Sequence, residues 1–423
     1  MLFNNKKHNA FLVAILMAFI SCETIKESKP IVENKINFSH FNHLYKEIKF
    51  NGKEVGIVHI YSEYPEYEFE IEPNEGFTCV DDVARAVVMF SKHLKTNEDK
   101  EAFNKMEKLT QFVLLMQNEN GYFNNFIWND LSINTTYKTS VAELNWWSFR
   151  ALWALESAYD LLKSDKDLAN RIEIATEKLL VNIKRDISIN NLKVETIEAI
   201  KVPTWLPQKY ASDQSALLIL GLLKNYERTA NEEIKVLIDS LAKGIMIMQK
   251  GNVDNYPYGA FLSWQNLWHA WGNIQAYALL KAGQKFNNQI YINSALKEID
   301  NFYPYLLKNG FAEAFWIEKN EENSYSEIKR NDYPQIAYGL RPMVWAASEA
   351  YQYSKNKKYL KLTTDLESWL SGNNDAKTVM YNPETGICFD GIKSKEEISK
   401  NSGAESTIES MLILLEIKKL KQE

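Results

Sequence analysis

Carboxyl groups recur along this chain at the places where apolar, helix-forming segments begin. Five of six such segments carry an acid at or beside the start: Asp81 with Asp82, Glu143, Asp213, Asp332 and Glu405. Hydrolysis of a glycosidic bond needs two carboxyl groups, one protonated and one ionised. The spacing therefore predicts a catalytic site, provided that the fold brings these helix starts together.

The starts of adjacent packed helices lie about 8–10 Å apart, which suits the carboxyl separation of an inverting hydrolase. We predict Asp82, with Glu143 or Asp213, as the catalytic acids, and Asp81, Asp332 and Glu405 as substrate contacts. Neighbouring helical residues point about 100° apart, so Asp81 and Asp82 should differ in role, and we expect Asp82 to face the cavity. Simple helix stabilisation is the alternative, since a first-turn acid contributes about 0.3–1 kcal/mol without catalysis.

Aromatic residues near the same helix starts supply the other part of a sugar site. Flat rings match the apolar C–H faces of pyranoses, and the candidates are Trp146, Trp205, Trp268 and Trp271. His269 is a candidate base or a hydrogen-bonded wall of the site. Arg341 is a candidate for binding a substrate carboxylate. The remaining helical tryptophans are predicted to belong to the core: Trp147, Trp153, Trp345 and Trp369.

Amphipathic helical patterns fill the chain beyond residue 78. The predicted helices are Val80–His93, Glu101–Gln117, Val141–Leu162, Leu168–Lys184, Asp213–Tyr226, Glu232–Gln249, His269–Ala282, Ile290–Leu307, Arg341–Ser354, Tyr359–Leu370 and Ala404–Lys418. They form hairpins that repeat every 55 to 70 residues, roughly, as in a repeat architecture. With Phe38–Ile48 as a twelfth helix, they predict an all-α (α/α)6 toroid over residues 38–423; a solenoid is the alternative.

The segment 51–77 interrupts the helical pattern. Val55–Tyr61 reads as a strand, and the acidic, aromatic residues after it read as a loop at the rim. The toroid is therefore expected to carry a short N-terminal extension of strand and loop.

The N-terminal residues indicate export. Lys6 and Lys7 precede the apolar run Ala10–Ile20, which is too short for a membrane span and typical of a signal peptide. Ser21-Cys22 resembles the lipobox of bacterial lipoproteins, which implies a signal peptide over 1–21, lipidation of Cys22 and a polar tether over 22–37. We expect membrane attachment through this lipid alone, on the periplasmic or outer surface of a bacterial cell; an ordinary secretory peptide is the alternative.

Composition excludes several other classes of function. The net charge of −6 is spread without a basic stripe, which argues against nucleic-acid binding. Six histidines and three cysteines show no metal-ligand spacing, so neither a metal nor a cofactor is predicted. Cys79 and Cys388 precede the first and last inner helices. They are predicted either to form a disulfide across the ring seam or to remain buried thiols.

Three segments resemble the six-hairpin glycosidase-like superfamily, including exported bacterial lipoproteins. They are EGFTCVDDVARAVVMF (75–90), CFDG (388–391) and SGAESTIESML (402–412). The resemblance implies an (α/α)6 toroid and places Asp81, Asp82, Arg85, Asp390 and Glu405 at matching positions. It also implies a choice among glycoside hydrolases, glucuronyl hydrolases, epimerases and polysaccharide lyases.

Three hypotheses follow for the function. The first is a glycoside hydrolase acting on an oligo- or polysaccharide. The second is a polysaccharide lyase or another uronate-directed enzyme that uses His269, Tyr338 and Arg341. The third is a surface lipoprotein that binds glycans without turnover.

Overall fold

The computed structural model describes residues 36–422. The predicted signal peptide, Cys22 and all but the last two residues of the predicted tether lie outside the described residues. No helix in the described part of the chain is long and apolar enough to cross a bilayer.

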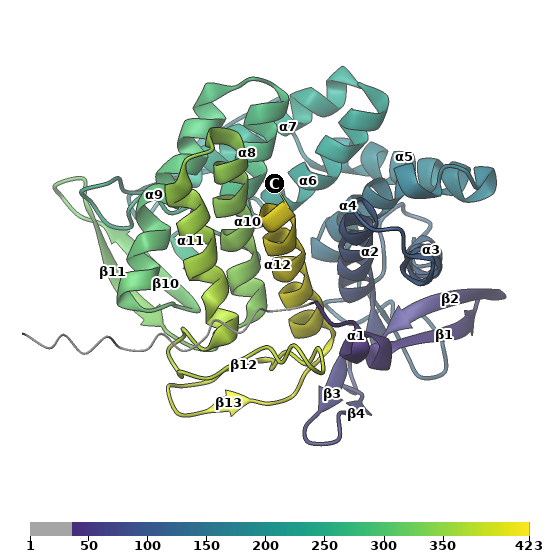
Figure 1. Ribbon diagram of the computed structural model, residues 1–423. Helices are drawn as coiled ribbons and strands as arrows, with labels where there is room; N and C mark the ends of the chain where they lie inside the picture. The colour runs from purple at the N-terminus through teal and green to yellow at the C-terminus, as the bar shows by residue number, and fades with distance from the viewer. Residues whose placement is uncertain (1–35, 423) are drawn as a thin grey trace, which may run out of the picture. The chain divides into compact units, whose positions relative to one another are not determined.

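Six inner helices form a closed ring (Figure 1). They are α2 (Val80–Leu94), α4 (Trp146–Leu162), α6 (Ser212–Thr229), α8 (Gln275–Lys285), α10 (Ala337–Ser354) and α12 (Ala404–Gln422). Each packs against the next in chain order, and α12 returns to pack against α2. This closure confirms the predicted (α/α)6 toroid and excludes the open solenoid.

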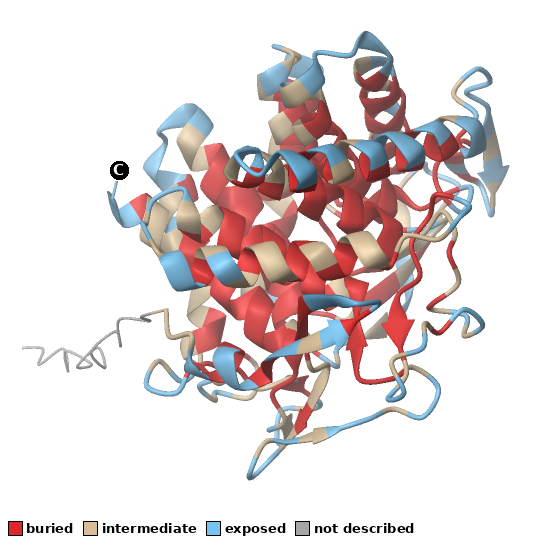
Figure 2. Ribbon diagram, turned by 90° about the vertical axis from the view of Figure 1, so that its right-hand side faces the viewer, coloured by how far each residue is buried: buried red, intermediate tan, exposed pale blue. Residues whose placement is uncertain are grey.

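The outer helices alternate with the inner ones along the chain. They are α3 (Lys100–Leu115), α5 (Lys166–Asp186), α7 (Glu232–Met248), α9 (Gln289–Asn309) and α11 (Lys357–Glu367), which the 3₁₀ turn η1 (Ser368–Ser371) extends. Each α-helix of this set begins behind an Asp or Asn whose side chain accepts a backbone N–H: Asp99, Asp165, Asn231, Asn288 and Asn356. Such N-caps fix where an outer helix starts. Figure 2 shows the buried residues concentrated inside the molecule and the exposed ones on its outer surface.

The predicted twelfth helix is shorter than expected. Only Ser39–Leu44 is helical (α1), and it packs against α12. The prediction was wrong from Tyr45 onwards, because Tyr45–Phe50 forms strand β1 and pairs with β2 (Lys53–Val58).

The strands form small antiparallel sheets between the helices. They are β3 (Tyr61–Glu63) with β4 (Glu68–Glu70), β5 (Thr78–Cys79) with β6 (Phe126–Ile127), β7 (Val194–Ile197) with β8 (Ile200–Pro203), β9 (Leu267–His269) with β10 (Ala314–Lys319) and β11 (Tyr325–Asn331), and β12 (Gly391–Ile392) with β13 (Ile398–Ser399). The strand predicted over Val55–Tyr61 is split between β2 and β3. In Figure 1, β3, β4, β12 and β13 lie at the end of the ring where α12 begins.

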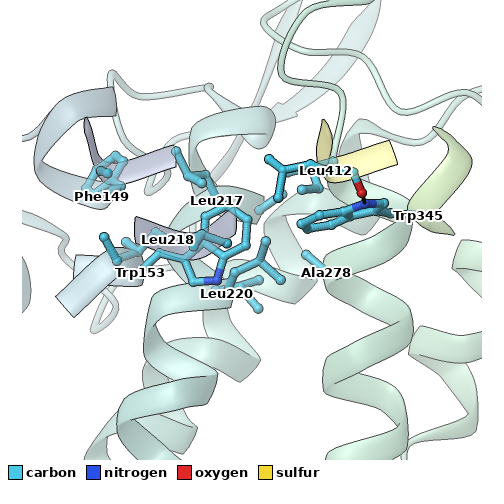
Figure 3. Close-up of a cluster of buried hydrophobic side chains, with 14 of the residues drawn as sticks. Phe149, Trp153, Leu217, Leu218, Leu220, Ala278, Trp345 and Leu412 are labelled. Atoms are coloured by element: carbon cyan, nitrogen blue, oxygen red, sulfur yellow. Dashed lines mark hydrogen bonds between the residues drawn. The ribbon is translucent and has the colours of Figure 1, made fainter. Parts of the chain in front are cut away.

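Apolar side chains from several inner helices meet inside the ring (Figure 3). Trp153 of α4 and Trp345 of α10 lie edge to face, with ring centres 5.9 Å apart. All four tryptophans predicted for the core are buried, which confirms that assignment: Trp147, Trp153, Trp345 and Trp369. The middle of the toroid is therefore filled by packed side chains.

The predicted disulfide across the seam was wrong. Cys79 and Cys388 are both buried free thiols. The Cys79 sulfur turns onto the first turn of its own helix, where it accepts from the Asp82 N–H at 3.4 Å and donates to Asp82 Oδ2 at 3.3 Å. The Cys388 thiol lies 3.7 Å from the Phe389 carbonyl oxygen.

Candidate active site

An acidic cavity opens where α2, α10 and α12 begin. Its volume is about 370 Å³, and five carboxylic acids line it: Glu75, Asp81, Asp82, Asp390 and Glu405. Arg85, Tyr61 and Tyr338 also line it. We refer to this space as the acidic cavity.

Arg85 holds three of the nearby carboxylates. Its guanidinium lies 2.6 Å from Asp82 Oδ1, 2.7 Å from Glu405 Oε2 and 3.0 Å from Glu409 Oε1. Arg85 and Glu409 are buried, whereas about 40% of the Glu405 side chain is exposed. One cation of α2 thus fixes two acids of α12 beside its own Asp82.

Arg150 of α4 contacts residues on the opposite side of the acidic cavity. Its Nε lies 2.7 Å from Asp81 Oδ1, and its Nη2 donates to the Tyr338 hydroxyl at 2.5 Å. The Tyr338 ring is contacted by both cations, with the Arg85 guanidinium 4.7 Å and the Arg150 guanidinium 5.0 Å from its centre. Burial raises the pKa of the Tyr338 phenol, and the two arginines oppose that rise.

The two acids of the Asp81–Asp82 doublet differ in partner and in exposure. Asp82 is the residue that pairs with Arg85, and it is only 3% exposed. Asp81 pairs with Arg150 from the next inner helix, and 22% of its side chain remains exposed. Both line the acidic cavity, but Asp81 offers solvent and substrate the more accessible carboxylate.

Glu405 and Asp390 are the acids with the environment of a proton donor. Protein surrounds most of the Glu405 carboxyl, and this burial raises its pKa to about 7, although Arg85 opposes the shift. Burial also raises the pKa of Asp390, whose Oδ1 accepts from Ser406 Oγ at 2.6 Å and from the Gly403 N–H at 2.8 Å. Burial likewise raises the pKa of Asp82.

Asp213 and His269 form a second polar group farther round the ring. His269 Nε2 lies 3.0 Å from Asp213 Oδ2, and its Nδ1 lies 2.7 Å from the Trp271 carbonyl oxygen. The imidazole stacks on the Trp271 indole with ring centres 3.5 Å apart, and Trp271 lies 6.2 Å from Trp146. Both partners of His269 are oxygen atoms, and together they fix the orientation of the imidazole.

Gly272 joins this second group to the acidic cavity. A Cβ atom on Gly272 would lie 2.8 Å from the Trp146 indole and 2.9 Å from the Tyr338 hydroxyl. Trp271 is 38% exposed and Trp146 is half-buried. Two indoles therefore stand next to the cavity wall that Tyr338 forms, in positions to contact a bound sugar ring.

Several predicted site residues lie elsewhere. Trp205 and Trp268 are in the core: the Trp205 indole donates to the Ser240 carbonyl at 2.9 Å, and Trp268 stacks on Phe315 at 4.9 Å. Trp268 was misplaced because α8 begins at Gln275, six residues later than predicted, so Trp268 and His269 belong to β9.

Arg341, Asp332 and Glu143 do not line the acidic cavity either. Arg341 is 1% exposed and is bound by Glu409 at 2.5 Å inside the ring, where a substrate carboxylate cannot reach it. Asp332 pairs with Arg330 at 2.5 Å in a separate surface hollow. Glu143 precedes α4 and accepts from the Asn145 side chain at 2.9 Å.

The sequence argument missed Arg150, Tyr61, Glu75 and Glu409. One signal was available for Arg150: it stands one turn inside an inner helix, as Arg85 and Arg341 do. Tyr61 and Glu75 come from the strand-and-loop extension, where the Tyr61 hydroxyl donates to Glu75 Oε2 at 2.6 Å, and no periodic pattern marks them.

None of the acids in this region is the N-cap of its helix. The inner helices α6, α8 and α10 begin without a side-chain cap, and α2 is capped by the Cys79 sulfur. Asp81, Asp82 and Asp213 nevertheless lie in the first turns of their helices, where a carboxylate stabilises the helix, and Asp213 Oδ1 accepts from the Gln214 N–H at 2.6 Å. Their carboxylates are also paired with cationic side chains or with His269. Within residues 36–422, no group of three or more His, Cys, Asp or Glu side chains is arranged to hold a metal ion.

Comparison with solved structures establishes the fold. A cellobiose 2-epimerase from Bacillus thermoamylovorans superposes with a TM-score of 0.63 at 12% identity, covering 91% of this chain and 96% of the epimerase. A family 76 glycoside hydrolase from a bovine Bacteroides thetaiotaomicron strain gives 0.55 at 10% identity, covering 89% and 75%. A polysaccharide lyase gives 0.54 at 11% identity, covering 82% and 91%.

The chain thus has the (α/α)6 toroid fold of these solved structures. No protein-family model matches the chain, and no curated protein matches it by sequence. Because enzymes of different chemistry share this fold, the reaction has to be argued from the site.

Proposed function

We propose that this protein is a carbohydrate-active enzyme that hydrolyses glycosidic bonds in the acidic cavity, with Glu405 as the general acid and Asp81 as the second carboxylate. The observation that carries the proposal is the raised pKa of Glu405, about 7, in a cavity that also holds an arginine-bound carboxylate. A general acid must keep its proton near neutral pH, while its partner must be ionised.

The positions of the two carboxylates support these roles. Glu405 and Asp81 are both partly exposed to the cavity, whereas Asp82 is buried. Arg150 forms an ion pair with Asp81 at 2.7 Å, which holds this carboxylate at the edge of the cavity. Arg85 holds Glu405 in place, while burial of the carboxyl keeps its proton available.

The character of the cavity favours a neutral sugar as substrate. Five acids line it, and its arginine already contacts carboxylates of the protein. A uronate would meet carboxylate repulsion there. The indoles of Trp146 and Trp271 beside the cavity suit the C–H face of a pyranose ring.

The test is hydrolysis of a panel of neutral oligosaccharides, followed by reducing-end release. On any substrate found, Glu405→Gln and Asp81→Asn are each expected to lower kcat by at least about 10²-fold. Glu397→Gln, at an exposed surface pair with Lys393, is the matched control and should leave kcat unchanged. Full activity in both site variants would contradict the assignment, and binding without turnover across the panel would indicate a glycan-binding protein instead.

The pH profile gives an independent check of the general acid. Because Glu405 must be protonated to donate, kcat/KM is expected to fall as the pH rises through about 7. The measurement is kcat/KM between pH 5 and 9, roughly, on the same substrate. A profile that is flat through neutrality would remove Glu405 from the acid role.

Tyr338 favours one alternative reaction, β-elimination by a lyase. Its hydroxyl lies in the cavity and is held by Arg150 at 2.5 Å, which suits a base that removes a proton next to a sugar carboxylate. Arg341, predicted as the carboxylate neutraliser, is unavailable because Glu409 binds it. Ultraviolet absorbance of an unsaturated product, on a uronate polymer, would distinguish elimination from hydrolysis.

We also propose, from the N-terminal sequence, that the protein is exported and anchored through a lipid on Cys22. The support is the basic residues, the apolar run and the lipobox-like Ser21-Cys22. Cys22→Ala is expected to move the protein from the membrane fraction to the soluble exported fraction. Unchanged fractionation of this variant would contradict the anchor.

A further inference from the structure

A second cavity lies at the opposite end of the ring, between the C-terminal halves of the inner helices. Its volume is about 230 Å³. Six lysines line it from four inner helices and the loop after α2: Lys92, Lys95, Lys224, Lys281, Lys418 and Lys419. We refer to it as the lysine cavity. It is separated from the acidic cavity by the packed core shown in Figure 3.

The acids of the lysine cavity do not balance these cations. Only Glu349 and Glu416 line it. Glu416 accepts from Lys92 at 2.9 Å and lies 3.9 Å from Lys419, and these two lysines lower its pKa to about 2 against the opposing effect of burial. Glu349 is occupied by Lys281 at 3.2 Å. Both acids are therefore already paired with lysines of the cavity.

Lys95 and Lys418 lack an acidic partner among the residues that the structure describes. Lys418 donates to the neutral Asn97 side-chain oxygen at 2.9 Å. Burial and the neighbouring cations Lys224 and Lys92 lower the pKa of Lys95 to about 8. Lys224 forms an ion pair with Glu227, so the cations of the cavity without an acidic partner among the described residues are Lys95 and Lys418. The chain as a whole carries a net charge of −6.

The floor of the lysine cavity is aromatic. Trp153, Trp345 and Tyr277 line it, and the Tyr277 ring lies 5.3 Å from that of Trp345. Lys92 stands over the Trp345 ring at 4.3 Å. The three rings are not coplanar, and Trp345 is only 1% exposed. Apolar ring atoms and ammonium groups nevertheless line the same cavity, which suits a ligand with a sugar-like body and an anionic group.

Neutralisation of helix dipoles explains only part of this arrangement. Cations are favoured in the last turn of a helix, which accounts for Lys92, Lys95 and Lys419. Lys224 and Lys281 stand before the last turns of α6 and α8, which end at Thr229 and Lys285. Their side chains nevertheless converge on the same cavity.

We propose that the lysine cavity binds the phosphate group of a small phosphorylated sugar, with the sugar ring over the aromatic floor. Phosphate is the common biological anion that several converging ammonium groups suit best. The cavity is smaller than the roughly 300–1,000 Å³ of pockets for larger ligands, which favours one sugar unit over a polymer. This site is independent of the hydrolytic proposal.

The experiment is calorimetric titration of the purified protein with glucose 6-phosphate, inorganic phosphate and glucose at constant ionic strength. Glucose 6-phosphate is expected to bind, inorganic phosphate to bind more weakly, and glucose to give no signal at this cavity. The double variant Lys95→Met/Lys224→Met should weaken glucose 6-phosphate binding by at least 10-fold, roughly, since two charge-assisted contacts are removed.

The matched control is Lys163→Met/Lys361→Met, which removes the same charge from exposed positions outside the cavity. Equal weakening in the two double variants would overturn the proposal, because net charge alone would then explain binding. Absence of binding by every phosphorylated ligand would also overturn it. Binding to vesicles containing phosphatidylglycerol without binding of glucose 6-phosphate would overturn it in favour of a membrane surface.

A measurement on the unmodified protein covers the case in which the double variant fails to fold. Acylation with a limiting amine-reactive reagent, followed by mass spectrometry, reports the reactivity of each lysine. Saturating glucose 6-phosphate should protect Lys95 and Lys224 at least 3-fold, roughly, and leave Lys163 unchanged. Equal reactivity of Lys95 with and without the ligand would contradict the site.

Discussion

At the scale of single residues, the ends of the ring differ in how their charges are compensated. At the acidic cavity, Arg85 contacts carboxylates of two helices, Asp82 of α2 and Glu405 of α12, and Arg150 of α4 pairs with Asp81 of α2. Breaking one partner of a buried pair leaves the other charge desolvated and poorly compensated. Substitutions at neighbouring carboxylates are therefore expected to affect stability and catalysis to different extents.

Asp81 and Asp82 should separate these two properties. Asp82→Asn is expected to lower the free energy of unfolding by about 1–3 kcal/mol, because buried Arg85 loses one of three charged partners. Asp81→Asn is expected to lower kcat, and it also costs stability because buried Arg150 loses its carboxylate partner. Urea unfolding and kcat measured on both variants check this. An unchanged kcat in Asp81→Asn would show that the more accessible carboxylate is not catalytic.

Ionisation of Glu405 is expected to lower the stability of the folded protein as the pH rises. Its pKa is raised from 4.5 to about 7 in the folded protein, so the folded state holds this proton more tightly. The resulting stabilisation is present below pH 4.5 and is lost as the pH rises through about 7. Glu405→Gln should therefore become more stable relative to the wild type as the pH rises. A difference in unfolding free energy that stays constant from pH 4.5 to 8, roughly, would contradict this.

At the scale of elements, close helix packing sets the geometry of the ring. Gly221 in α6 faces α4 so closely that a Cβ atom there would lie 2.9 Å from Leu152 Cγ and 3.1 Å from the Trp153 backbone nitrogen. Leu152 is fully buried and the Trp153 nitrogen belongs to a helix backbone, so neither has room to move freely. The absence of a side chain at Gly221 fixes the distance between α4 and α6.

Gly221→Ala tests whether packing or helix propensity dominates. Propensity alone would stabilise the helix by about 1 kcal/mol. Overpacking against α4 is expected to outweigh this and to destabilise the protein by about 1–3 kcal/mol. Thermal or urea unfolding gives the sign directly. A more stable Gly221→Ala variant would mean that α4 and α6 separate at little cost.

In the whole molecule, one buried carboxylate links the last inner helix of the ring to the first. Glu409 of α12 contacts Arg85 of α2 at 3.0 Å and Arg341 of α10 at 2.5 Å. It therefore joins the last inner helix to the first and to its predecessor. All three side chains are buried, so solvent cannot replace a lost partner.

Removal of Glu409 should weaken the closure as a whole. Glu409→Ala is expected to lower the free energy of unfolding by about 3–5 kcal/mol, because two buried arginines lose a shared carboxylate. Glu397→Ala, which removes an exposed partner of Lys393, should change it by less than about 1 kcal/mol. Comparable unfolding midpoints for the two variants would show that the seam does not depend on Glu409.

The sequence by itself determined the helical repeat and much of the core. Hydrophobic periodicity is a local property, so it predicted the helices and the buried Trp147, Trp153, Trp345 and Trp369 correctly. Boundaries were weaker where tertiary strand pairing competed with helix: His269 was predicted as the first residue of a helix but pairs with β10.

Only the tertiary structure decided which charges meet. Asp82 and Asp81 are adjacent in the chain, yet one pairs with Arg85 and the other with Arg150 of another helix. Glu405 acquires its raised pKa from burial beside α2, more than 300 residues away in sequence, which no local pattern encodes. The lysine cavity likewise arises from residues of separate helices, because ring closure, not sequence spacing, sets the distances between charged side chains.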